Sequence, residues 1–90
     1  MTIDRSTLRQ HLLEKVRARG AEKSICPSEV ARDLGGVEWR SLMDTIRSIG
    51  AELVDSGEIL ALQRGQPVHP LSAKGPIRFK LNPNRKATEN

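Results

Sequence analysis

Apolar residues recur at helical spacing in the first part of the chain. Between residues 4 and 20 they lie mostly three or four positions apart, with basic residues at many of the positions between; the apolar set is Leu8, Leu12, Leu13 and Val16. This pattern predicts an amphipathic helix. Asp4 or Ser6 can cap its first backbone N–H groups, and Gly20 is expected to end it.

A second, shorter helix is predicted over residues 27–34. Pro27 suits the first position of a helix, because the N–H that it lacks would have no partner there. The predicted buried stripe consists of Val30, Ala31 and Leu34. The pair Gly35-Gly36 is expected to end the helix, and Ile25 is expected to form a brief strand before it.

The longest helical pattern covers residues 37–56. Its apolar residues fall on one face, and they are Trp39, Leu42, Met43, Ile46, Ile49, Leu53 and Val54. Gly50 lies on the same face, where the missing side chain permits close packing at a cost of about 1 kcal/mol in helix propensity. We expect Gly57 to end this helix.

Strand patterns replace helical ones after residue 57. Residues 58–64 are predicted to form a strand. In residues 76–81 the apolar positions Ile77, Phe79 and Leu81 alternate with Arg78 and Lys80, which is the period of a half-buried strand. Residues 65–75 contain two Gly and two Pro and are predicted to form a long loop. Residues 82–90 are predicted to be a mobile tail.

Together these elements predict an α+β domain of the winged helix-turn-helix type over residues 4–81. Two helices around a glycine-containing turn match a helix-turn-helix. The two strands, with the long loop between them, would form the wing. In such domains the third helix usually enters a DNA groove, and the wing lies beside it.

Three segments resemble a small bacterial family of winged-helix domains of unknown function. They are ICPSEVARDLGG at residues 25–36, WRSLMDTIR at residues 39–47 and GQPVHPLSAKGPIRFKL at residues 65–81. The resemblance extends over residues 8–81, with the motifs in the same order. It implies a bacterial, cytoplasmic protein with a helix-turn-helix-like fold, and it supplies no catalytic residues.

Length and composition exclude several classes of protein. A chain of 90 residues is one domain by length. Its single Cys excludes a secreted scaffold held by disulfides. No segment approaches the roughly 18 consecutive apolar residues of a membrane span, and no signal-peptide pattern opens the chain. We therefore expect a cytoplasmic protein with no membrane partner.

Charge favours an anionic partner, with nucleic acid first among the candidates. The formal net charge is +4 and the isoelectric point is about 9.8. Aromatic residues make up only 2% of the chain, which argues against a single-strand binder that stacks bases on exposed rings. The partner predicted from these two observations is double-stranded DNA.

The positive charge is concentrated at the two ends of the chain. Residues 1–20 carry a net +3 and residues 58–90 a net +4, whereas residues 21–36 carry −1 and residues 37–57 carry −2. The third helix is therefore acidic, although it is the helix expected to enter a groove. We expect helix one and the wing to make most of the contacts with the duplex, through its phosphates.

Eight residues are candidates for these contacts. Two arginines and two serines come from the third helix, and four cations come from the wing and its strands. The candidates are Arg40, Ser41, Arg47, Ser48, Arg64, Lys74, Arg78 and Lys80. Serine can meet a base or a phosphate, and basic wings contact phosphates or enter the minor groove. The alternative is that these residues form ordinary solvent-facing surfaces of the helix and the sheet.

No catalytic, metal or cofactor site is predicted. Cys26 precedes a helix start, but nothing in the spacing brings His11 or His69 to it. One Cys and two scattered His do not match metal-ligand spacing, and no phosphate-loop motif is present. We therefore predict that the protein is not an enzyme and that it requires neither a metal nor a cofactor.

A protein-interaction role is the alternative function. Trp39 is expected to anchor the core, but an exposed edge beside Val37 and Val68 would provide the centre of a protein interface. The domain would then be a winged-helix interaction or dimerisation module that binds no nucleic acid. Its acidic third helix would face a protein partner or a second copy of the chain.

Overall fold

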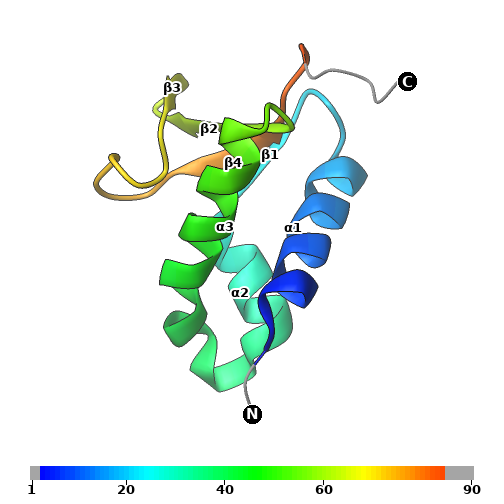
Figure 1. Ribbon diagram of the computed structural model, residues 1–90, viewed down its shortest axis with the longest axis vertical. Coiled ribbons are helices and arrows are strands. Elements are labelled where there is room, and N and C mark those ends of the chain that lie inside the picture. Colours follow the sequence, from blue (N-terminus) through cyan, green and yellow to red (C-terminus); the bar gives the residue numbers. More distant parts are fainter. Residues whose placement is uncertain (1–2, 85–90) are drawn as a thin grey trace.

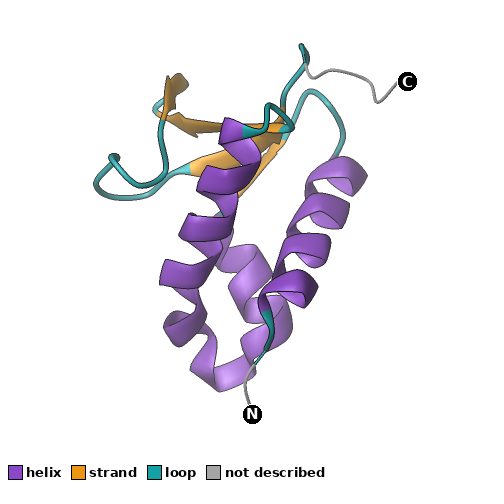
Figure 2. Ribbon diagram, viewed as in Figure 1, coloured by secondary structure: helices purple, strands orange, loops and turns teal. Residues whose placement is uncertain are grey.

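The computed structural model describes residues 3–84 and has an α+β fold, which confirms the predicted class (Figures 1 and 2). The helices are α1 (Arg5–Arg19), α2 (Pro27–Gly35), the 3-10 helix η1 (Gly36–Leu42) and α3 (Met43–Asp55). The strands are β1 (Ser24–Ile25), β2 (Ile59–Gln63), β3 (Gln66–Val68) and β4 (Arg78–Leu81). The helices stand together, and the sheet lies across one end of α1 and α3 (Figure 1).

The first helix begins and ends where its capping residues predict. The Asp4 carboxylate accepts a hydrogen bond from the backbone N–H of Thr7 at 3.1 Å. At the other end, Gly20 adopts a φ of 103°, a conformation that side-chain-bearing residues rarely take. Its N–H donates to the Arg17 carbonyl and so satisfies one of the free carbonyls of the last turn.

The short second helix is also confirmed. Pro27 occupies its first turn, and the Glu29 side chain accepts a hydrogen bond from the Cys26 N–H at 2.9 Å. The predicted brief strand at Ile25 is β1, which pairs with β4.

The continuous helix predicted over residues 37–56 was wrong, because the chain forms η1 before α3. Glu38 leaves helical geometry at φ −95° and ψ 15°. Gly35 allows this tight turn, since a side chain there would collide with Leu42 and crowd Trp39. Over so few residues, the apolar spacing of a 3-10 helix differs little from that of an α-helix.

The long loop predicted over residues 65–75 was also wrong, because it contains the additional strand β3. Arg64 and Gly65 have φ values of 54° and 80° and form a two-residue turn between β2 and β3. Two positive φ values are the signature of a type I′ hairpin turn. Pro67 concealed the strand in the sequence, but β3 is an edge strand, where proline is tolerated.

The sheet is antiparallel throughout, with the order β1-β4-β2-β3. The alternation predicted for residues 77–81 is confirmed, since Ile77, Phe79 and Leu81 are buried. In β2 the residues Ile59 and Ala61 face the core, whereas Leu60 and Leu62 are half-buried. Because their register partners are Lys80 and Arg78, the outer face of the sheet combines apolar and basic side chains.

The core is tightly packed where the sheet meets α3. A Cβ on Gly50 would overlap the ring of Phe79, which is itself fully buried, so the predicted close packing at this glycine is confirmed. The rest of the core comes from all three α-helices and from the sheet: Leu8, Leu12, Val16, Ile25, Val30, Ala31, Ile46, Ile49, Leu53, Ile59, Ala61, Ile77 and Leu81. Six residues of the predicted apolar sets pack against this core but are only partly buried: Leu13, Leu34, Trp39, Leu42, Met43 and Val54.

The predicted tail over residues 82–90 lies mostly outside the described residues. Its first residue is held in place, since the Asn82 N–H and side-chain amide donate to the carbonyls of Glu58 and Gly57, both at 3.1 Å. Residues 85–90 are not described.

Two carboxylates of α2 fasten it to α1. Burial by itself would raise the pKa of Glu29, but a backbone N–H and the Arg19 guanidinium at 2.5 Å outweigh burial and hold the pKa below its ordinary value of 4.5. Asp33 accepts hydrogen bonds from His11 and Lys15, both at 2.8 Å, and these bonds hold its pKa below 3.8.

We expect the free energy of unfolding to fall as the pH is lowered below about 4.5. A carboxylate whose pKa is lowered by folding stabilises the protein fully above its unfolded pKa, and this stabilisation is lost as the pH falls through the folded pKa. Glu29→Gln should therefore lose less stability than the wild type between about pH 5 and about pH 3, measured by urea unfolding. Glu22→Gln, in the exposed turn after α1, is the control, and an unchanged slope in Glu29→Gln would contradict the assignment.

We expect Gly50→Ala to destabilise the fold by about 1 kcal/mol. The new methyl group meets the Phe79 ring at an overpacking cost of about 1–3 kcal/mol, which exceeds the gain in helix propensity of about 1 kcal/mol. Phe79→Leu opens space at this contact, so adding Gly50→Ala to that variant should be neutral or stabilising. Equal effects of Gly50→Ala in both backgrounds, measured by urea unfolding, would show that the two residues do not interact.

Candidate nucleic-acid interface

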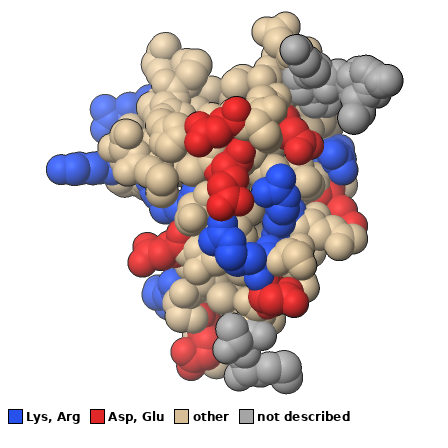
Figure 3. Space-filling view, in the orientation of Figure 1, with Lys and Arg blue, Asp and Glu red and all other residues tan. Residues whose placement is uncertain are grey.

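The five cations of α1 pair with four carboxylates from other parts of the chain. Arg5 and Arg9 pair with Glu52, Lys15 with Asp33, Arg17 with Glu58 and Arg19 with Glu29, at N–O distances of 2.5, 3.4, 2.8, 3.5 and 2.5 Å. Figure 3 shows basic and acidic side chains interleaved across this face. The net +3 of residues 1–20 therefore does not produce an isolated positive surface on α1.

The four cations predicted around the wing differ from those of α1. Within residues 3–84, no ion pair joins Arg64, Lys74, Arg78 or Lys80 to a carboxylate. Arg78 is held by neutral groups instead, since its Nε donates to the Ser24 hydroxyl at 2.7 Å and its Nη2 to the Ser24 carbonyl at 3.0 Å. Their positive charge is therefore not cancelled locally.

Arg47 braces the loop formed by residues 69–77 against α3. Its guanidinium donates to the carbonyls of Ala73 at 2.9 Å, Gly75 at 3.1 Å and Pro70 at 3.4 Å. Each N–H that serves this loop is less available to an external ligand. Arg47 thus keeps its charge beside the predicted interface while it positions the loop.

Two further side chains hold the same loop. The Gln63 amide nitrogen donates to the carbonyls of Lys74 at 2.5 Å and Pro76 at 3.2 Å. The His69 ring nitrogen Nε2 pairs with Asp55 of α3 at 3.1 Å, and Nδ1 accepts from the Leu71 N–H at 3.3 Å. Hydrogen bonds and an ion pair in this way attach the loop of residues 69–77 to α3 and to β2.

Three of the candidates predicted on the third helix lie on two different elements. Arg40 and Ser41 lie in η1, and Ser48 lies on α3. The Arg40 guanidinium stacks 4.4 Å from the centroid of the Trp39 ring, and the Ser41 hydroxyl donates to the Glu38 carbonyl at 2.8 Å. Ser48 is half-buried.

Trp39 only partly fulfils its predicted role as a core anchor. The ring packs against the core cluster but stays half-buried, and Arg32 also stacks over it at 4.5 Å. Of the two neighbours expected for an interface, Val37 is 93% exposed, whereas Val68 packs against the core. The surface around Trp39 therefore presents one cation from α2, one from η1 and one exposed aliphatic side chain.

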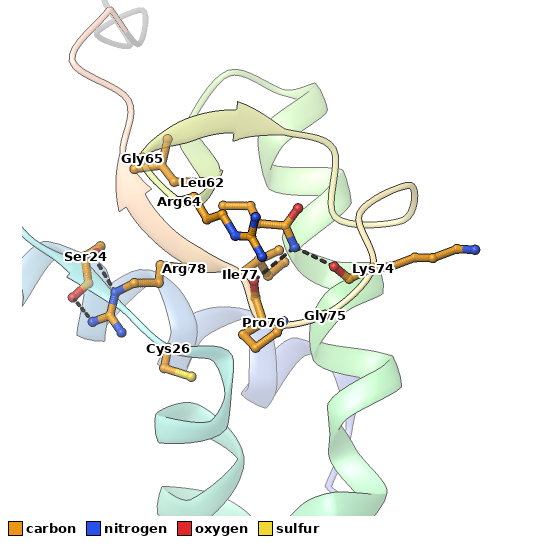
Figure 4. Close-up of a pocket in the computed structure, with 11 residues that line it drawn as sticks. Ser24, Cys26, Leu62, Arg64, Gly65, Lys74, Gly75, Pro76, Ile77 and Arg78 are labelled. Carbon is orange, nitrogen blue, oxygen red and sulfur yellow. Dashed lines mark hydrogen bonds between the residues drawn. The ribbon is translucent and has the colours of Figure 1, made fainter.

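A groove of about 620 Å³ lies between the start of α2, the outer face of the sheet and the end of the loop. It is lined by Ser24, Cys26, Leu62, Gln63, Arg64, Gly65, Lys74, Gly75, Pro76, Ile77 and Arg78. The lining contains three basic residues and no carboxylate. In Figure 4 the Lys74 side chain extends away from the groove, whereas Arg64 reaches toward Pro76 and Ile77.

The residues that the sequence did not single out in this region are Ser24 and Gln63. Ser24 is the register partner of Lys80 and meets Arg78 across 54 positions of the chain, so no local pattern could reveal it. The Gln63 side chain bridges two carbonyls of a loop whose path the sequence did not predict.

Other chemically active residues are dispersed. The Cys26 thiol lies 3.0 Å from the Ser28 hydroxyl, and His11 and His69 pair with Asp33 and Asp55. In the described range 3–84 there is no group of three or more His, Cys, Asp or Glu residues that could hold a metal ion. Over the same residues, no helix is long and apolar enough to cross a membrane.

Comparison with known proteins confirms the resemblance to a family of unknown function. No curated protein matches the chain. A family match, in contrast, extends over residues 5–82, which includes every described helix and strand. By this match the chain belongs to the family described as protein of unknown function (DUF3253).

Proposed function

We propose that this domain is a winged helix that binds double-stranded nucleic acid through its wing and the η1–α3 edge. The order of α1, β1, α2, α3 and the antiparallel strands β2 and β4 supports this proposal, because it matches the order expected of a winged helix-turn-helix, to which the chain adds η1 and β3. The wing is here residues 64–77, which comprise the Arg64-Gly65 turn, β3 and the loop.

The observation that carries this proposal is the basic surface of the wing and its strands, where no carboxylate pairs with the cations. Arg64, Lys74, Arg78 and Lys80 are not neutralised within the described residues, unlike the five cations of α1. Cations of this kind displace the counterions condensed on a duplex, and that displacement is the main source of affinity for nucleic acid. We therefore place most of the duplex contacts on the wing and its strands. Helix one makes fewer contacts than the net charge of residues 1–20 indicates.

The bracing of the loop supports the same location. Because Arg47 holds three carbonyls of the loop, the wing lies beside α3 before any ligand arrives, as the two elements do in Figure 1. A surface that is already ordered loses less conformational entropy on binding. Lys74 projects from this loop and is well placed to contact a phosphate (Figure 4).

The chemistry of η1 and α3 favours contact with the backbone over the reading of bases. Arg40 is exposed and next to Ser41, but Asp44 and Glu38 lie close by in the sequence and are also exposed. Carboxylates are repelled by phosphates, and Ser distinguishes bases poorly. We therefore propose binding with low sequence specificity and a strong dependence on salt.

Neutralising one cation of the wing and one of β4 should weaken duplex binding more than neutralising two cations of α1. Lys74→Gln with Lys80→Gln removes two unpaired cations, so affinity for a labelled duplex should fall about tenfold or more. The plot of log K against log salt should become less steep by about 1.8, because each phosphate contact contributes about 0.9 to the magnitude of the slope. Fluorescence anisotropy at several salt concentrations measures both quantities.

Arg5→Gln with Arg9→Gln is the matched control, since it removes the same charge from cations that are already paired with Glu52. Equal losses in the two double variants would contradict a wing-centred interface. A wild-type protein that does not bind duplex at low salt below about 100 µM would overturn the proposal. That result would favour the alternative, a protein partner at the exposed Val37 beside Trp39.

Arg47→Lys tests the brace without changing the charge. Lysine presents a single ammonium and cannot match the planar fork that reaches three carbonyls. We expect faster amide hydrogen exchange at Ser72 and Ala73, whose N–H groups donate to the His69 carbonyl inside the loop, and duplex affinity several-fold lower. Unchanged exchange would show that Arg47 does not hold the loop.

A further inference from the structure

The groove beside the wing has the size and the chemistry of a small-ligand site. We propose that it binds a small organic phosphate with a flat apolar body, of the size of a mononucleotide. Its volume of about 620 Å³ falls within the range of about 300–1,000 Å³ that is common for such sites. This inference does not rest on the proposed binding of duplex nucleic acid.

The charge of the groove selects an anion. Arg64 and Arg78 belong to its lining, and no carboxylate does. Arg78 is preoriented, since Ser24 takes its Nε and Nη2, and within the described residues Nη1 makes no hydrogen bond. A fixed guanidinium with a remaining donor is well suited to bind a phosphate oxygen.

The turn explains the conformation at position 64, but it does not explain why the residue there is an arginine. Arg64 is the one non-glycine residue with positive φ in the described chain, and asparagine adopts that conformation at lower cost. Its side chain lines the groove and, in the view of Figure 4, extends in the direction of Ile77 and Pro76. The chain thus carries a cation at a turn position where asparagine would stabilise the fold better.

The remaining lining selects a ligand larger than inorganic phosphate. The half-buried Leu62 and the exposed Pro76 supply apolar surface to the same groove. A flat ring can pack against this surface and against the face of a guanidinium. A phosphate attached to a planar ring satisfies both parts of the site, and adenosine monophosphate is a suitable probe.

The alkylation rate of the single cysteine can report whether a ligand occupies the groove. Cys26 lines the groove and is half-buried, so a bound ligand should slow its alkylation by iodoacetamide. We expect adenosine monophosphate to protect the thiol in a saturable way. Arg64→Asn and Arg78→Gln should each raise the concentration needed for half-protection about tenfold.

Arg64→Asn separates binding from folding, because asparagine suits the turn and should leave the free energy of unfolding equal or higher. Arg17→Gln, which removes a cation paired with Glu58, is the charge-matched control. In this variant adenosine monophosphate should protect the Cys26 thiol at the same concentration as in the wild type. Absence of saturable protection up to about 10 mM, or equal losses in Arg17→Gln and Arg64→Asn, would overturn the proposal. Half-protection by inorganic phosphate at the same concentration as the nucleotide would overturn the assignment of a flat apolar body.

A parallel titration with labelled duplex keeps the two proposals distinct. Duplex binding without nucleotide protection would overturn the groove as a small-ligand site and leave the proposed function standing. Nucleotide protection without duplex binding would support the groove and overturn the proposed function.

Discussion

The ring of Phe79 lies against the backbone of Gly50, and this contact fixes how closely the sheet approaches α3. Phe79 sits in β4, the strand that pairs with both β1 and β2, so its position sets the position of the whole sheet. The same approach brings the loop close enough for Arg47 to reach its carbonyls. A larger residue at position 50 would push the sheet outward and lengthen every contact between the loop and α3.

Two arginines show how burial and neighbours, rather than charge alone, decide what a cation does. Arg47 and Arg64 were both expected at the nucleic-acid surface. Arg47 faces three carbonyls of the loop, those of Pro70, Ala73 and Gly75, and it serves them with a planar fork. Arg64 stands on an exposed turn and lines a groove whose lining contains no carboxylate. Only the second arrangement leaves the guanidinium largely available to a ligand.

Local chemistry explains which parts of the fold could be predicted from the sequence. The ends of α1 follow from Asp4 and Gly20, and the alternation around Phe79 follows from strand geometry, because each depends on neighbours within a few residues. Strand β3 was missed because Pro67 is tolerated only at an edge, and its edge position depends on distant strands. The pairing of α1 was missed for the same reason, since Arg5 and Glu52 lie 47 positions apart.

The candidate site was likewise predicted only where local sequence information suffices. The cations of the wing were identified by counting charges along the chain, which requires no tertiary information. The groove was not, because β1, β4 and the loop come together only in the folded molecule. Nor can charge counting show which cations are paired, and in this chain that distinction separates α1 from the wing.

Neither edge strand of the sheet is suited to pair with a strand of another chain. One edge, β1, has only two residues, and the other, β3, has three residues with Pro67 at its centre. Proline lacks the N–H that a neighbouring strand would need, and a two-residue edge offers too few groups to template pairing. A small sheet whose outer face carries apolar Leu60 and Leu62 is thereby protected from edge-to-edge aggregation, which would otherwise compete with any ligand for this side of the molecule.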